Sequence, residues 1–136
     1  MRRLLLALAA ILATAISACN PPRVAQGAPV LTPDARAQLR ALKAKAKFRP
    51  DYLAGYVGVD APEDLPPLTA SVNGLIDDVL AHPDGPVSEG DILPLVATAV
   101  HKVDAFATAD RERAYRYFGQ VWTILGLQGE PVRQVP

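Results

Sequence analysis

Residues 108–127 read TADRERAYRYFGQVWTILGL, and this stretch decides the fold. A threonine followed by acids in the first turn favours the start of a helix, and the closing Gly-Leu pair is typical of a helix end. Apolar side chains recur at the three- and four-residue spacing of one helix face. They are Tyr115, Phe118, Trp122 and Leu125. The stretch therefore predicts an amphipathic helix whose aromatic row belongs to a core.

Two further helices are predicted directly upstream. Residues 88–106 hold the helical period, and Ser88 with Asp91 resembles a capping box. Pro94 lies near the start of this segment, so either Asp91 is the true cap or the helix begins with a kinked turn. Residues 68–81 carry a broad apolar face and end in the turn sequence HPDGP.

A fourth helix begins at Thr32, where a capping hydroxyl is followed by Pro33 and Asp34. It should end near residues 47–49, because Pro50 disfavours helical geometry in the residue before it.

The long segment 49–67 has neither a helical nor a strand period. A loop of this length is often functional, but it can equally pack as an extended strap. We favour the strap, with Tyr52 and Tyr56 filling gaps between helices. The sequence thus predicts an all-α domain over residues 32–127, a small bundle of about four helices with a long irregular loop between the first and second. Residues 128–136 are expected to form a flexible tail without burial.

The chain begins with two arginines and an apolar run of about a dozen residues, which is typical of a signal peptide. The run is shorter than the roughly 20 residues that a membrane-spanning helix needs. Residues 1–18 are therefore predicted to be a removable signal peptide. Residues 19–31 contain three prolines and no period, so we expect a tether that spans about 20 Å.

The residues Ile16-Ser17-Ala18-Cys19 resemble the lipobox of bacterial lipoproteins, in which the cysteine takes a diacylglycerol before cleavage. Cys19 is the only cysteine, so no disulfide competes with lipidation. This resemblance implies an exported protein anchored to a membrane through lipid on Cys19. Asn20 follows the cysteine, which in such lipoproteins implies the periplasmic face of the outer membrane.

Fourteen basic and fourteen acidic residues give a balanced charge, but their distribution is uneven. Cations dominate residues 32–49, whereas acids dominate residues 50–110. On the first helix the cations form a stripe that could face anionic lipid headgroups or simply be solvated. The stripe consists of Arg36, Arg40, Lys43 and Lys47.

No motif for phosphate, dinucleotide or zinc chemistry is present in the sequence, so we predict no catalytic residue, no cofactor and no nucleic-acid partner. His82 and His101 lie near aspartates, but His101 falls opposite the apolar face of its helix and His82 is placed to meet the carbonyl end of its own helix. A metal site is therefore not predicted. Tyr117 lies off the aromatic row, and we expect it to be exposed.

Residues 106–127, with an acidic first turn, the pair Tyr117-Phe118 and an Ile-Leu-Gly ending at 124–126, resemble the carboxy-terminal signature of a bacterial family of small helical domains of unknown function. The resemblance supports a helical fold and brings no catalytic residues with it.

These observations favour a non-enzymatic binding or accessory lipoprotein of the cell envelope that meets a protein partner through exposed loops and its acidic middle. One alternative is an immunity or inhibitor protein whose acidic surface caps a basic partner. Another is a small envelope enzyme, which would need Asp, His and Tyr side chains to converge in a cleft.

Overall fold

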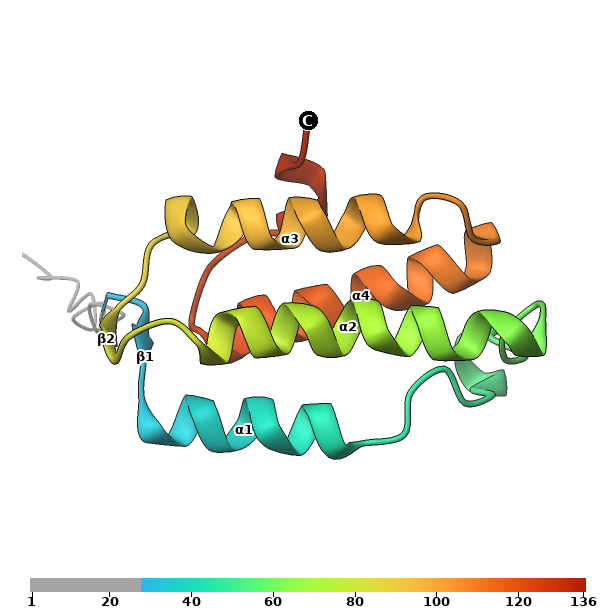
Figure 1. Cartoon of the computed structure of the whole chain (residues 1–136), viewed down its shortest axis with the longest axis horizontal. Coiled ribbons are helices and arrows are strands. Elements are labelled where there is room, and N and C mark those ends of the chain that lie inside the picture. The colour runs from blue at the N-terminus through green and yellow to red at the C-terminus, as the bar shows by residue number, and fades with distance from the viewer. Residues whose placement is uncertain (1–27) are drawn as a thin grey trace, which may run out of the picture.

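The computed structural model describes residues 28–136, in which four α-helices run along the length of the molecule (Figure 1). They are α1 (Pro33–Ala44), α2 (Leu65–Leu80), α3 (Glu89–Val103) and α4 (Thr108–Ile124). The second helix lies at the centre and contacts the other three. The predicted all-α bundle is confirmed. The predicted signal peptide, Cys19 and most of the predicted tether lie outside the described residues.

A two-stranded antiparallel sheet closes one end of the bundle (Figure 1). Its strands are β1 (Val30–Leu31), directly before α1, and β2 (Gly85–Pro86), directly after the turn that ends α2. The chain therefore enters the described domain at the sheet end, and the long loop between α1 and α2 lies at the opposite end. No helix of residues 28–136 is long and apolar enough to span a membrane.

The first helix begins as predicted, because the Thr32 hydroxyl accepts a hydrogen bond from the third helical amide. It ends at Ala44, earlier than expected, since the backbone turns to an extended conformation at Lys45. The Lys47 ammonium then donates to the carbonyls of Lys43 and Lys45.

The second helix begins at Leu65, three residues before the predicted start, because both following prolines fit its first turn.

The capping box of α3 is confirmed, with Ser88 as the N-cap and Asp91 bonded back to its amide. The alternative prediction, that Asp91 is the true cap, is therefore wrong, and Pro94 lies inside the helix. In α4 the N-cap is Ala107, so the predicted cap at Thr108 is also wrong by one residue. The helix ends at Ile124 with Leu125 as its C-cap, and the predicted stop, Gly126, follows directly with a left-handed φ of 76°.

Side chains from all four helices form one core. Phe118 and Trp122 of the predicted aromatic row are fully buried, and Tyr115 packs partly buried against them. The predicted exposure of Tyr117 is wrong, because this side chain is only 6% exposed.

The carboxy-terminal residues also join the core. A 3₁₀ turn, η3 (Pro131–Gln134), contacts α3 and α4, and Pro131 is buried. The Trp122 indole nitrogen donates to the Gln128 carbonyl at 2.9 Å. The structure thus differs from the expectation of a tail without burial. A buried indole N–H needs an acceptor, and the tail supplies it through the Gln128 carbonyl.

Candidate functional site

Three of the four cations in the predicted basic stripe are engaged within the domain. The Arg36 guanidinium lies 2.7 Å from Asp84, and Lys43 lies 2.6 Å from Asp77. Lys47 is buried against backbone carbonyls, and burial, followed by the charge of Lys43, lowers the pKa of its ammonium. Of these four residues, Arg40 alone is exposed and without an ion pair to another described residue. The stripe offers little free charge to a surface.

The carbonyl end of α2 is bonded by Arg36 rather than by His82, which the sequence had placed there. Arg36 donates to the carbonyls of Leu80 and His82, at 2.6 and 2.7 Å, whereas the His82 ring contacts the Pro83 carbonyl. His101 lies on the surface beside Asp104. Within residues 28–136 no three His, Cys, Asp or Glu side chains gather as a metal site.

The most unusual feature of the surface is the apical loop, residues 51–57, at the end of the bundle opposite the sheet. Asp51 and Tyr56 pair as an isolated antiparallel bridge, with N–O distances of 2.7 and 2.9 Å. Between them the 3₁₀ turn η1 (Tyr52–Ala54) leads to Gly55, whose φ of 71° favours glycine. The bridge closes the loop into a compact turn.

Two side chains of α4 hold this loop. Asp110 has no exposed surface, and its carboxylate accepts hydrogen bonds from the Tyr56 hydroxyl at 2.6 Å and from the Asp60 amide at 3.1 Å. Arg113 donates to the Asp51 carboxylate at 3.1 Å. Both ends of the turn are thus bonded to one helix. Because the Asp110 acceptor is removed from water, its two hydrogen bonds are more costly to lose than exposed ones.

Aromatic packing reinforces these bonds. The Arg113 guanidinium lies between two rings, 5.3 Å from the centroid of Tyr56 and 5.8 Å from that of Tyr117. The Tyr117 hydroxyl accepts from the Phe48 amide, and the two rings meet edge to face at 5.4 Å. Phe48 has a φ of 55°, a strained value for a non-glycine residue. The chain entering the loop is therefore fixed as well.

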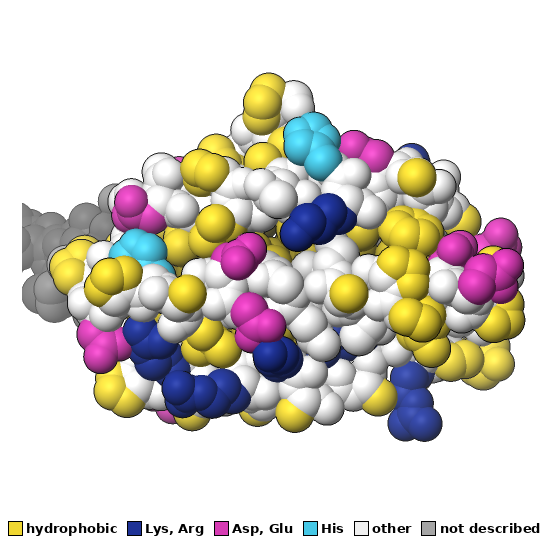
Figure 2. Space-filling view, viewed as in Figure 1, with side chains coloured by type: hydrophobic (Ala, Val, Ile, Leu, Met, Phe, Trp, Pro, Cys, Tyr) yellow, Lys and Arg dark blue, Asp and Glu magenta, His cyan; other side chains and the backbone are white. Residues whose placement is uncertain are grey.

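Against this rigid base, the outer side chains of the loop are apolar and exposed. Leu53 is fully exposed, and Tyr52 and Val57 are 75% and 74% exposed. Hydrophobic side chains gather at this end of the molecule, with acidic side chains beside them (Figure 2). The predicted strap is therefore correct for Tyr56, which fills a gap, and wrong for Tyr52, which points to solvent.

The Tyr56 phenol should make the stability of the domain fall at alkaline pH. Burial, followed by the hydrogen bond to Asp110, raises the pKa of this phenol well above the value of 10.0 that is ordinary for tyrosine. The folded state then keeps a proton that the unfolded state releases above about pH 10, so stability should fall as pH rises through that range. Urea titrations between pH 8 and 11 should show a steeper loss for the wild type than for Tyr56→Phe. Equal slopes would contradict the assignment.

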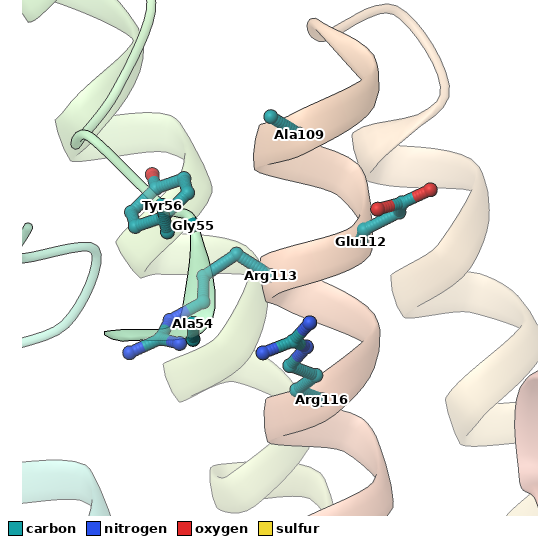
Figure 3. Close-up of a pocket in the computed structure, with 7 residues that line it drawn as sticks. All are labelled: Ala54, Gly55, Tyr56, Ala109, Glu112, Arg113 and Arg116. Atoms are coloured by element: carbon teal, nitrogen blue, oxygen red, sulfur yellow. The ribbon is translucent and has the colours of Figure 1, made fainter. Parts of the chain in front are cut away.

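The apical loop and the buried pair beneath it differ in their access to other molecules. The pair Asp110 and Tyr56 is the nearest approach to the constellation that an enzyme would need, but Asp110 has no surface with which to touch a substrate. A hollow of about 60 Å³ lies beside the pair, between the loop and α4 (Figure 3). Small-molecule sites usually measure about 300 Å³ or more. The exposed apolar loop is the better candidate.

Fold and site together define a small helical-bundle domain that presents a fixed apolar loop at one end. Residues 30–130 match the family described as domain of unknown function (DUF4844), and the chain belongs to this family. The match covers all four helices and is consistent with the resemblance of residues 106–127 to an uncharacterised family. Neither the curated proteins nor the solved structures gave a match.

Proposed function

We propose that this protein is an exported lipoprotein, anchored through Cys19, whose helical domain binds a protein partner in the cell envelope through the apical loop. The observation that carries the binding role is the exposure of Tyr52 and Leu53 on a loop that α4 holds in place. The binding role is non-enzymatic.

Exposed apolar side chains on an anchored loop favour binding for two reasons. Exposed apolar patches on soluble domains commonly mark interaction sites, and tyrosine is enriched among the residues that dominate binding energy. Ordering a mobile loop on binding costs free energy, whereas a loop already fixed by Asp110 and Arg113 avoids most of that cost.

The arrangement of the two ends suits a membrane-anchored binder. The chain enters the domain beside β1, and α1, with 12 residues, separates this point from the apical loop by about 18 Å. If Cys19 carries lipid, the tether of about 20 Å leads to the sheet end and leaves the loop facing away from the bilayer. The outer membrane is the proposed location, as the residue after the cysteine implies.

A second candidate is an immunity or inhibitor role against a basic partner. Three acids follow the loop, and none forms an ion pair with another described residue. They are Asp60, Glu63 and Asp64. Such a partner would combine an apolar pocket with a basic rim.

Replacing Cys19 with Ala tests the anchor. The mature wild-type protein should begin at Cys19, carry acyl mass and fractionate with membranes, because two or more acyl chains bind a bilayer stably. Cys19→Ala should lose both the added mass and the membrane association, as followed by intact mass spectrometry and fractionation. A soluble wild type, or acyl groups on the variant, would contradict the proposal.

Affinity capture from detergent-solubilised envelopes tests the binding role, which fails if the lipidated chain recovers no reproducible partner.

A further inference from the structure

The chain that carries the apical loop is attached to one helix. Residues 48–60, which we call the hinged segment, make four hydrogen bonds to other parts of the described domain, and all four go to side chains of α4. These side chains lie three and four positions apart and so share one face of the helix; they are Asp110, Arg113 and Tyr117. The segment can therefore leave the domain without breaking a hydrogen bond between helices.

The hinged segment begins at a residue with a strained backbone. Phe48 is the only non-glycine residue among residues 28–136 with a positive φ, which is 55°. A left-handed backbone is unfavourable for an L-residue because Cβ approaches the following carbonyl oxygen. It persists only where the surroundings enforce it. At Phe48 they do so through the bond from its amide to the Tyr117 hydroxyl and through burial of its ring.

The chain is fixed on both sides of Phe48. Before it, the Lys47 ammonium donates to two carbonyls of the chain that ends α1. After it, Pro50 has a φ that its ring restricts, and the bridge between Asp51 and Tyr56 closes the loop into one compact body. A hinge is a position that absorbs a change of φ and ψ between two rigid parts, and Phe48 lies at such a position.

We propose that the hinged segment opens and closes as one unit about Phe48, and that its closed fraction sets how much of the apical binding surface is presented. The structure shows the closed form. Burial of Phe48 and Tyr56 favours this form, whereas the strain at Phe48 opposes it. The partner binds the closed form, in which the exposed Leu53 is held in place. This inference rests on the proposed function and adds its regulation.

Amide hydrogen exchange of the full-length chain in low denaturant tests whether the segment is one unit. Four of its amides are hydrogen-bonded in the closed form: Phe48, Asp51, Tyr56 and Asp60. They should exchange through one shared opening, with protection at least about tenfold lower than that of amides in the middle of α4. Unrelated protection factors, or exchange only together with α4, would overturn the proposal.

Phe48→Gly and Phe48→Ala together test the strain. Both remove the ring, but glycine adopts a positive φ freely and alanine does not. Protection of the other three amides should be at least about fivefold higher in Phe48→Gly. The matched control pair is Phe106→Gly and Phe106→Ala, since Phe106 is also partly buried outside the helices but has no positive φ, and glycine should bring no gain there. Protection in Phe48→Ala that equals or exceeds that in Phe48→Gly would refute the hinge.

Tyr117→Phe decides the matter if loss of the Phe48 ring leaves the segment open in both variants. It keeps both rings and removes only the hydroxyl that accepts from the Phe48 amide. Protection of the Asp51, Tyr56 and Asp60 amides should fall by one common factor of about threefold or more, with the middle of α4 unchanged. An effect confined to the Phe48 amide would mean that the segment does not open as a unit.

Capture from detergent-solubilised envelopes tests the regulation. In the Asp110→Ala background the segment should be mostly open, so capture becomes proportional to the closed fraction. There Phe48→Gly should capture about fivefold more partner than Phe48→Ala, with circular dichroism confirming that the helices of both remain folded. Equal capture would overturn the regulation. The proposed function still stands if Leu53→Asp abolishes capture by the otherwise wild-type chain, and it fails as well if Leu53→Asp has no effect.

Discussion

Replacing Asp110 with Ala is expected to lower the free energy of unfolding by about 2–4 kcal/mol. The change leaves the Tyr56 hydroxyl and the Asp60 amide without their acceptor, and the position has no exposed surface through which water could replace it. Relief from burying a carboxylate offsets part of the loss. Urea denaturation followed by circular dichroism measures the difference.

Glu112→Ala is the control for this change, since Glu112 is an exposed carboxylate on the same helix with no ion pair in the described chain. It should alter stability by no more than about 0.5 kcal/mol. If Asp110→Ala were as mild as Glu112→Ala, the buried carboxylate would not be the anchor of the loop.

Leu53→Asp is expected to reduce capture of the envelope partner at least about tenfold without changing the melting temperature of the domain. Leu53 is fully exposed, so the fold loses no buried contact, whereas an apolar pocket on the partner would have to desolvate a charge. Quantitative immunoblotting of captured partner measures the effect.

Ala37→Asp, an exposed substitution of the same charge on α1, is the matched control and should leave capture unchanged. Equal capture by wild type and Leu53→Asp would contradict a role for the loop. An equal loss in both variants would point to general charge repulsion instead.

The helices could be predicted from the sequence because their determinants are local. The Thr32 cap, the Ser88 capping box and the Gly126 end each depend on residues within one turn. The early end of α1 was not predicted, because there the Lys47 ammonium bonds the carbonyls of Lys43 and Lys45.

The anchor could have been found in part. The buried face of α4 is wider than the predicted aromatic row through Phe118. A second row beside it is also buried and recurs at helical spacing; it consists of Asp110, Ala114, Tyr117 and Val121. Asp110 was expected to serve the helix dipole, which is the usual role of an acid in a first turn. A stripe of apolar residues that leads back to such an acid was the available sign that the acid is buried.

The apical loop could not have been predicted from local sequence. Tyr52 and Tyr56 are identical residues four positions apart, yet one is exposed and the other is buried. Their difference depends on Asp110, which is 54 positions from Tyr56 in the chain. Likewise the four residues of the predicted basic stripe recur at helical spacing in the sequence, but long-range partners such as Asp84 and Asp77 engage two of them in ion pairs.

The central claim is that α4 holds an exposed apolar loop in one conformation, and amide hydrogen exchange tests it most directly. Asp51 and Tyr56 donate their amides to each other across the bridge. In the wild type both should exchange at least about a hundredfold more slowly than in an unfolded chain, and in Asp110→Ala the protection should be lost from the loop before the helices. Exchange of both amides at the unprotected rate in the wild type would show that the loop is not fixed, and would contradict the account.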